Sequence, residues 1–299
     1  MFFDFLKYTK VYYFLFGLLV IASLVSLFSF GLNFGIDFTG GSILEIDFLE
    51  QRPSNQEIQA KLSEFNLGEF VIQPTGEKGV IIRMREVDEE THQQIIAKIG
   101  ELAKLEEKKF ENIGPTVGRE LRQKTIQLIV ISSIVLLVYI AMAFRKISWP
   151  VSGWQCGVVS IVALSFDVLA TIGIFSLLGK YSNVQFNIPI VAALLTILGY
   201  TINDKVIVLD RVRENILKTH EMNFYNLVNQ SLNQILVRSL STGTCSLLIL
   251  LAIFFFGGET LKYFSLALII GIIIGTFSSL FLASPLLVSW KGGKTSSRA

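Results

Sequence analysis

The sequence predicts an α-helical polytopic membrane protein with six transmembrane helices and a small α+β domain inserted between the first two. Of its 299 residues, 52% are hydrophobic and only 17% are charged, whereas about 25% of a typical soluble domain is charged. The charge is also unevenly placed, because residues 37–124 hold 29 of the 50 charged side chains. These observations exclude a single soluble globule, a disordered chain and a basic nucleic-acid-binding protein.

Six long apolar runs locate the expected spans. Each has at least the roughly 20 residues that a helix needs to cross about 30 Å of hydrocarbon. The runs are Val11–Ile36, Thr125–Phe144, Val151–Gly179, Tyr181–Asn203, Ser239–Gly258 and Tyr263–Trp290. The first run resembles a signal peptide, but its length and the lack of an A-x-A site favour an uncleaved anchor. We therefore divide the chain into residues 1–36, 37–124, 125–290 and a tail at 291–299.

The short loops predict the orientation of these spans. If the N-terminus is cytoplasmic, ten Lys and Arg side chains near the span ends face the cytoplasm and only Lys180 and Lys262 face outward. The ten are Lys7, Lys10, Arg145, Lys146, Arg211, Arg213, Lys218, Lys291, Lys294 and Arg298. Both termini are then expected in the cytoplasm, and residues 37–124 on the outer face of the membrane.

The insert is expected to be a ferredoxin-like β-α-β-β-α-β domain. Alternating apolar and polar residues predict a first strand, and Ser54 with Glu57 three residues later predicts a capped helix. A Pro-Thr-Gly turn separates two short strands, and a second helix and a last strand follow. The predicted strands are Gly41–Phe48, Phe70–Gln73, Val80–Met84 and Lys108–Ile113, and the second helix is Asp88–Leu105.

No metal, cofactor or enzymatic chemistry is expected. The two histidines, His92 and His220, are too few and too far apart for a metal site. Cys156 and Cys245 both lie in apolar runs, which favours packing over a disulfide or a reactive thiol. The sequence contains no Walker, G-x-S-x-G or H-E-x-x-H motif.

Ionisable residues inside the spans are the candidates for function, because each costs roughly 2.5–3.5 kcal/mol to insert. Asp204 follows the polar patch Gly199–Asn203 and is expected in the inner half of the membrane, about 22 Å from the outer end of its span. Arg238 approaches the same depth through an amphipathic connector, Asn226–Val237. The residues leave three interpretations open. Asp204 and Arg238 form a pair that switches with protonation, they form a fixed structural strut, or each lies near the headgroups with Lys205.

Two further charges have other expected roles. Asp167 lies near the middle of the third run without an obvious partner, so a structural hydrogen bond to a neighbouring helix is the favoured interpretation. Lys205 is expected to extend towards the inner headgroups.

Small residues in two segments predict close packing. In the last span they recur at every fourth position, as Ala267, Gly271, Gly275, Ser279 and Ala283, which predicts a tight contact with another helix. The glycine-rich residues 35–41 suit a tight helix-to-strand junction. A cofactor-binding loop is the weaker alternative, since the segment precedes a strand and not a helix.

Three motifs resemble the SecF family of bacterial protein-export subunits over nearly the whole chain. IDFTGG at Ile36–Gly41 includes Asp37, Gly40 and Gly41, and IGPTVG spans Ile113–Gly118. GYTINDKVIVLDRVREN at Gly199–Asn215 is the most specific motif and includes Gly199, Asp210 and Arg211.

This resemblance implies a member of the resistance-nodulation-division superfamily in the bacterial inner membrane, with residues 37–124 in the periplasm. The implied partners are SecD, the SecYEG channel, the accessory proteins YajC and YidC, and an unfolded polypeptide in transit. Protons are the implied coupling ion. Asp204 and Arg238 match the family's proton-pathway residues, and Asn203 and Asp167 are expected to join them.

Two departures from the family pattern bear on this site. Phe166 stands where relatives often have histidine, and Lys205 stands where a small hydroxyl residue is usual. A proton-driven small-solute exporter and a purely architectural subunit remain alternatives. Six spans and 88 outer residues leave no room for a drug pocket, which weakens the exporter hypothesis.

Overall fold

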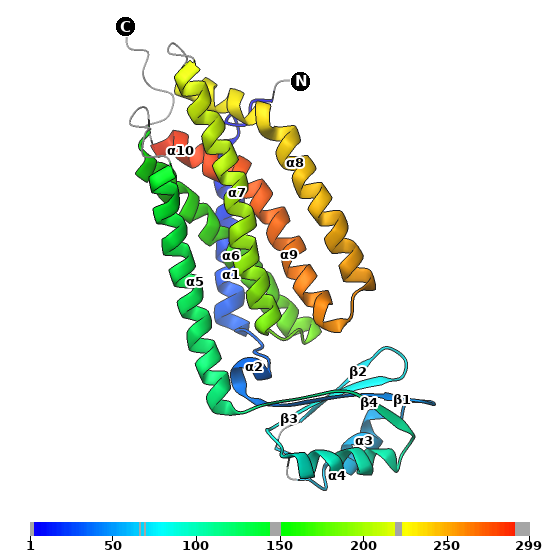
Figure 1. The fold of residues 1–299 in the computed structure, drawn as a ribbon. Helices are drawn as coiled ribbons and strands as arrows, with labels where there is room; N and C mark the ends of the chain where they lie inside the picture. The colour runs from blue at the N-terminus through cyan, green and yellow to red at the C-terminus, as the bar shows by residue number, and fades with distance from the viewer. Residues whose placement is uncertain (1–2, 66, 69, 144–150, 219–222, 291–299) are drawn as a thin grey trace. The chain divides into compact units, whose positions relative to one another are not determined.

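The structure, a computed structural model, describes residues 3–65, 67–68, 70–143, 151–218 and 223–290 (Figure 1). The chain forms two compact units, one of residues 34–126 and one of residues 1–33 with 127–299. Several residues used in the sequence analysis lie outside the described ranges. They are Arg145, Lys146, His220 and the 291–299 tail.

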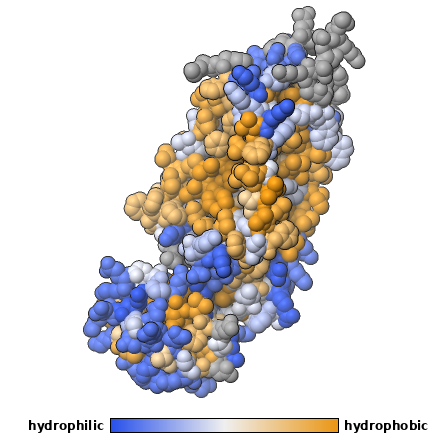
Figure 2. All heavy atoms as spheres, turned by 180° about the vertical axis from the view of Figure 1, so that it is seen from behind, coloured by the Kyte–Doolittle hydropathy of each residue, from blue (hydrophilic) through white to orange (hydrophobic). Residues whose placement is uncertain are grey.

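The larger unit is a helical bundle. Six helical segments are long and apolar enough to cross a membrane, which confirms the expected number of spans. Figure 2 shows hydrophobic side chains over most of the visible surface of these helices. The elements are α1 (Thr9–Phe30), the part of α5 (Pro115–Ala143) after residue 126, α6 (Gly153–Ser182), α7 (Ile188–Lys218), α8 (Phe224–Phe256), α9 (Glu259–Ser278), the π-helical turn η1 (Ser279–Ala283) and α10 (Ser284–Trp290).

Two helices extend well beyond the charge-free runs. The fourth span was expected to end at Asn203, but α7 continues without a break to Lys218. The amphipathic connector before the fifth span is also helical and forms the first turns of α8. Charged residues on one face do not interrupt the backbone hydrogen bonds of a helix, so the loss of hydrophobicity marks where the chain changes environment and not where a helix ends.

The small residues of the last span lie against α7. A Cβ added to Gly271 would overlap the side chain of Ile197, and one added to Gly275 would overlap Thr201. Close backbone approach through small residues is a common way for membrane helices to associate. The predicted tight contact of this span is therefore with α7.

The smaller unit is a four-stranded antiparallel sheet in the order β2-β3-β1-β4, with α3 and α4 on one face (Figure 1). This arrangement confirms the expected β-α-β-β-α-β order. The capping box of Ser54 and Glu57 opens α3 as predicted. Pro74 and Thr75, which were expected in the turn, belong instead to the end of β2. The elements are α2 (Ile36–Thr39), β1 (Gly41–Phe48), α3 (Asn55–Leu62), β2 (Val71–Thr75), β3 (Gly79–Met84), α4 (Glu89–Gly100) and β4 (Leu105–Ile113).

The core of this unit fills the space between the sheet and its two helices. Its side chains are apolar and almost fully buried, including Leu44, Ile46, Phe48, Ile58, Leu62, Ile82, Ile95 and Ile99. The alternation predicted for β1 places Leu44, Ile46 and Phe48 on the same face of the sheet.

The glycine-rich segment forms a compact junction. Gly40 has φ +77°, which residues with a side chain rarely adopt, and its Cβ would lie 2.7 Å from the Cα of Pro115. A Cβ on Gly118 would in turn lie 2.9 Å from the backbone nitrogen of Gly40. The IDFTGG and IGPTVG motifs therefore contact each other where the chain enters and leaves this unit.

Candidate functional site

The centre of the bundle holds a fully buried ion pair. Nζ of Lys205 on α7 lies 2.7 Å from Oδ2 of Asp167 on α6, and both side chains are 0% exposed. The same ammonium group donates a hydrogen bond to Oγ of Ser278 on α9, at 3.2 Å. One lysine side chain therefore connects three membrane helices.

This pair corrects one expectation and agrees with another. Lys205 does not extend towards the headgroups, whereas Asp167 accepts a hydrogen bond from a neighbouring helix, as the favoured interpretation had it. The physical reason is that one face of α7 packs against the other helices of the bundle. Thr201, Asp204 and Lys205 lie on this face and are almost fully buried. A lysine in the middle of a long, packed helix has no open path to an interface, so it must be paired inside the protein.

Asp204 lies on this inward face beside Lys205 and is 2% exposed. Thr276 on α9 donates a long hydrogen bond to its Oδ2, at 3.4 Å. We call the six side chains at this meeting of α6, α7 and α9 the polar cluster. Its members are Asp167, Thr201, Asp204, Lys205, Thr276 and Ser278.

The polar cluster is not fully satisfied. Oδ1 of Asp167 and Oγ1 of Thr201 are buried, and neither has a hydrogen-bond partner among the described residues. A buried polar atom left without a partner costs about 1–3 kcal/mol. Such atoms are expected where a proton, an ion or a water molecule takes part in function.

A π-helical turn follows the polar cluster directly. η1 begins at Ser279, one residue after the Ser278 that contacts Lys205. Single π turns within α-helices occur frequently at functional sites. The π turn therefore interrupts the regular α-helical hydrogen bonding of the last span directly after Ser278.

Arg238 lies apart from the polar cluster. It is exposed on α8, and no ion pair joins it to Asp204 although the structure describes both residues. It lines instead a cavity of about 370 Å³ between α7 and α8. The other residues lining this cavity are Val206, Ile207, Asp210, Arg211, Glu214, Gln234 and Ile235. The α7 residues among them begin two positions after Asp204 and continue to Glu214, so the cavity lies further along α7 towards Lys218.

The remaining residues expected at the site also lie outside the polar cluster. Asn203 is exposed, and a Cβ on Gly199 would meet no atom within 4 Å. Asp210 and Arg211 pair with neighbours on their own helix, Arg213 and Glu214. Asp37 is half-buried in the first turn of α2, in the other unit.

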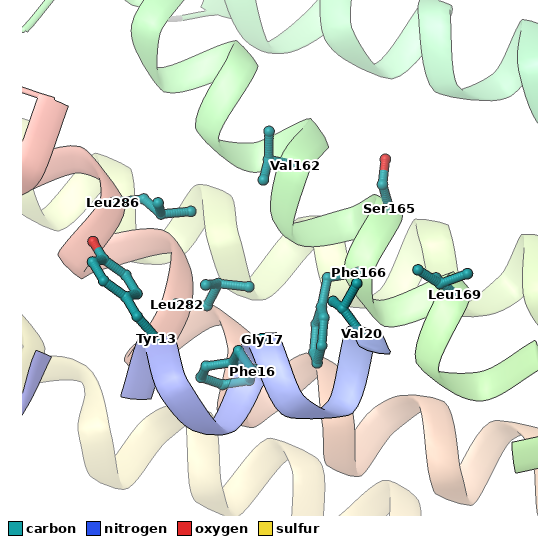
Figure 3. Close-up of a pocket in the computed structure, with 10 residues that line it drawn as sticks. All are labelled: Tyr13, Phe16, Gly17, Val20, Val162, Ser165, Phe166, Leu169, Leu282 and Leu286. Carbon is teal, nitrogen blue, oxygen red and sulfur yellow. The ribbon is translucent and has the colours of Figure 1, made fainter. Parts of the chain in front are cut away.

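Phe166, the residue before Asp167, faces an apolar pocket of about 290 Å³ (Figure 3). Its ring meets that of Phe16 on α1 edge to face, with centroids 4.9 Å apart. The pocket is lined by apolar side chains of α1, α6, η1 and α10, with Tyr13 and Ser165 as its polar members. Phe166 is therefore a packing contact in this chain.

The two cysteines are both free; Cys156 is buried and Cys245 is exposed. Cys156 packs within the apolar core of α6 and its neighbours, as expected of a packing residue.

Comparison with known proteins identifies the family. Residues 92–293 match the family described as "Protein export membrane protein SecD/SecF, C-terminal", and residues 25–48 match the "SecD/SecF GG Motif". The protein translocase subunit SecF of Thermobaculum terrenum is 39% identical, over 96% of this chain and 94% of its own length. This chain belongs to the SecF family. The SecF of Desulfurispirillum indicum is 35% identical, over 92% of this chain and 87% of its own length.

A solved structure shares this fold. The crystal structure of SecDF from Thermus thermophilus, described as a translocon-associated membrane protein, matches with a TM-score of 0.83 and 33% identity. The match covers 97% of this SecF-family chain but only 38% of the SecDF chain. A second structure, of SecDF in a super-membrane-facing form, matches with a TM-score of 0.70 and 32% identity. The family and the six apolar helices identify a multi-pass membrane protein of the translocase-subunit type, whose homologues are named for transport and not for catalysis.

Proposed function

We propose that this chain pairs with a SecD subunit in the bacterial inner membrane and uses the proton motive force to promote late steps of polypeptide export through SecYEG. Two observations support the pairing. The curated relatives are named SecF, and a SecDF chain contains a segment like this one within a polypeptide more than twice as long. In this proposal the termini are cytoplasmic, and residues 37–124 lie in the periplasm and handle the emerging polypeptide. YajC and YidC are the accessory partners.

The observation that carries the proposal is the burial of Asp167, Asp204 and Lys205 together where three helices meet. Apolar side chains of similar volume would hold the helices together at no electrostatic cost, since replacing a buried ion pair by hydrophobic residues is often neutral or stabilising. Retained charges inside a membrane bundle are therefore functional candidates by default. Proton binding is the chemistry that carboxylates at this depth support.

Asp204 is the proposed proton carrier, because Lys205 already compensates the charge of Asp167. Moving one proton across about 100 mV supplies roughly 2.3 kcal/mol, enough to bias two conformations that differ by a few kcal/mol. Protonation removes the charge that Asp204 presents to α9 and lets α7 shift against α8 and α9. Arg238 lies in the cavity between α7 and α8, where such a shift changes its surroundings. The periplasmic domain responds to this rearrangement.

Asp204→Asn tests the proposal, because the amide is similar in size but does not bind a proton. We expect proton-dependent export to be abolished while the complex with SecD still assembles. Export of a precursor into membrane vesicles, with and without an uncoupler, measures this. Glu120→Gln is the matched control, since it makes the same change on an exposed side chain of α5. Undiminished export by Asp204→Asn contradicts the proposal.

The second candidate function is that of an architectural subunit. The Asp167–Lys205 contact favours it, because a buried ion pair between α6 and α7 can act as a fixed strut. Under this hypothesis Asp204→Asn and Arg238→Ala both leave export unchanged, whereas deletion of the subunit removes the complex. The same export assay with these two variants therefore separates the candidates.

A further inference from the structure

The ammonium group of Lys205 occupies a place with the features of a metal-cation site. Asp167 Oδ2 and Ser278 Oγ approach it at 2.7 and 3.2 Å, from two different helices. Carboxylate and hydroxyl oxygens are the ligands that hard cations such as Na⁺ and Mg²⁺ prefer. The lysine nitrogen therefore places a positive charge, at hydrogen-bond distances, among oxygens of the kind that bind such cations.

Two further oxygens, one on the Asp167 carboxylate and one on the neighbouring Thr201, have no hydrogen-bond partner among the described residues. They are Oδ1 of Asp167 and Oγ1 of Thr201, both fully buried among the described residues. Thr201 and Asp167 both border Gly275, whose missing Cβ would overlap Thr201 and lie 3.5 Å from Asp167 Oδ2. The ion pair therefore has more buried oxygens in and next to it than the two with which the ammonium group forms hydrogen bonds.

We propose that Lys205 is a tethered cation that selects the proton as the coupling ion and excludes Na⁺ from the polar cluster. This inference rests on the proposed function of Asp204 in proton coupling. A lysine nitrogen cannot dissociate from its own chain, so the cation position stays filled in every conformation in which the contact with Asp167 persists. The only exchangeable positive charge is then the proton on Asp204.

Charge balance leads to the same assignment. With both aspartates ionised, Lys205 leaves the polar cluster with a net charge of one negative unit, which a single proton on Asp204 neutralises. Without Lys205 the net charge is two negative units, and a second cation is needed. The oxygens of Asp167, Thr201 and Ser278 are the ligands available to it. A threonine at position 205 would add one more hydroxyl and vacate the volume of the lysine stem.

The test compares the thermal unfolding of the purified chain with its partner subunit in sodium chloride and in choline chloride at equal ionic strength. We expect the native protein to show no difference between the two salts. Lys205→Thr is expected to gain a sodium-dependent rise in unfolding midpoint of about 2–4 °C when sodium is about ten times its dissociation constant. Lys205→Met is the matched control, because methionine removes the charge but fills the volume, and it is expected to show no response.

Several outcomes overturn the inference. A sodium-dependent shift in the native protein does so, as does a Lys205→Thr variant that folds equally well in both salts or is recovered in neither. Recovery of folded Lys205→Thr only in sodium supports it. A second measurement needs no variant, since the native chain must support the same export rate under a proton gradient with sodium or with choline.

Failure of the proposed function gives a different result. If Asp204→Asn exports normally, proton coupling at Asp204 is refuted, while a sodium response of Lys205→Thr still identifies the cation position. If Asp204→Asn abolishes export and Lys205→Thr shows no sodium response, proton coupling stands and the role of Lys205 in ion selection is refuted.

Discussion

Two ion pairs of identical length lie in opposite surroundings in the two units. Lys205 and Asp167 in the bundle, and Lys61 and Glu101 in the smaller unit, both have an N–O distance of 2.7 Å. The first pair is 0% exposed, whereas the second has side chains that are 29% and 53% exposed. An exposed pair gains little, because water screens it and each side chain loses freedom. A buried pair is costly to create and more costly to break, so burial and not distance decides its importance.

Breaking the buried pair gives the largest expected effect. Lys205→Met leaves the charge of Asp167 without compensation and is expected to lower the free energy of unfolding by about 3–5 kcal/mol. Thermal unfolding of the purified complex measures the loss. The double variant Lys205→Met with Asp167→Asn removes both charges and is expected to regain most of the stability. A double variant no more stable than the single one would show that charge compensation is not the cause.

Overpacking next to the same pair is expected to have an intermediate effect. A side chain at Gly275 would overlap Thr201 and approach Asp167, so Gly275→Val is expected to cost about 1–3 kcal/mol. The same unfolding measurement applies. Gly17→Ala on α1 is the control, because a Cβ there meets no atom within 4 Å. Equal stability of the two variants would contradict the close packing of α9 on α7.

Breaking the exposed pair between Lys61 and Glu101 gives the smallest expected effect on stability, and this effect is expected only at pH values at which Glu101 is ionised. The hydrogen bond from Lys61 lowers the pKa of Glu101 below its usual value of 4.5. Since the folded-state pKa is the lower one, this stabilisation is present above about pH 4.5 and is lost as the pH falls through the folded-state value. Lys61→Met is therefore expected to weaken the smaller unit slightly at pH 7 and not at pH 3.

Amide hydrogen exchange of α3 and α4 in the full chain measures this difference at both pH values. Lys104→Met is the control, because Lys104 is exposed and no ion pair of the described residues includes it. An equal effect of Lys61→Met at both pH values would show that lost packing of the lysine stem, and not charge, is responsible.

The smaller unit was largely predictable from its sequence because its signals are local. The alternation of Gly41–Phe48 and the capping box at Ser54 each lie within a few residues, and both appear in the structure as expected. The order of the strands followed from the order of elements along the chain. Pro74 shows the limit of such local prediction. It was expected in a turn but lies on the edge strand β2, and the local sequence around a proline does not distinguish these two positions.

The bundle was predictable in its number of spans but not in its buried contacts. Asp167 and Lys205 are 38 positions apart, and no local pattern indicates that their helices meet there. The extent of α7 was the missing signal, because a helix that continues to Lys218 places Lys205 in its interior. The expected contact between Asp204 and Arg238 also depended on where α8 packs along α7, and hydrophobicity alone did not specify that.

The contact between Gly40 and Gly118 gives the smaller unit the properties of a modular insertion. These two residues, one near each end of the unit, lie so close together that a single methyl group would not fit between the two backbones. The unit therefore spans the same short distance between the flanking segments as a short loop would span. The entropic cost of closing a loop grows only slowly with the number of residues that it encloses, so the size of the unit adds little to this cost. Such a unit can be enlarged, reduced or exchanged between related proteins while the spacing of the flanking segments stays the same.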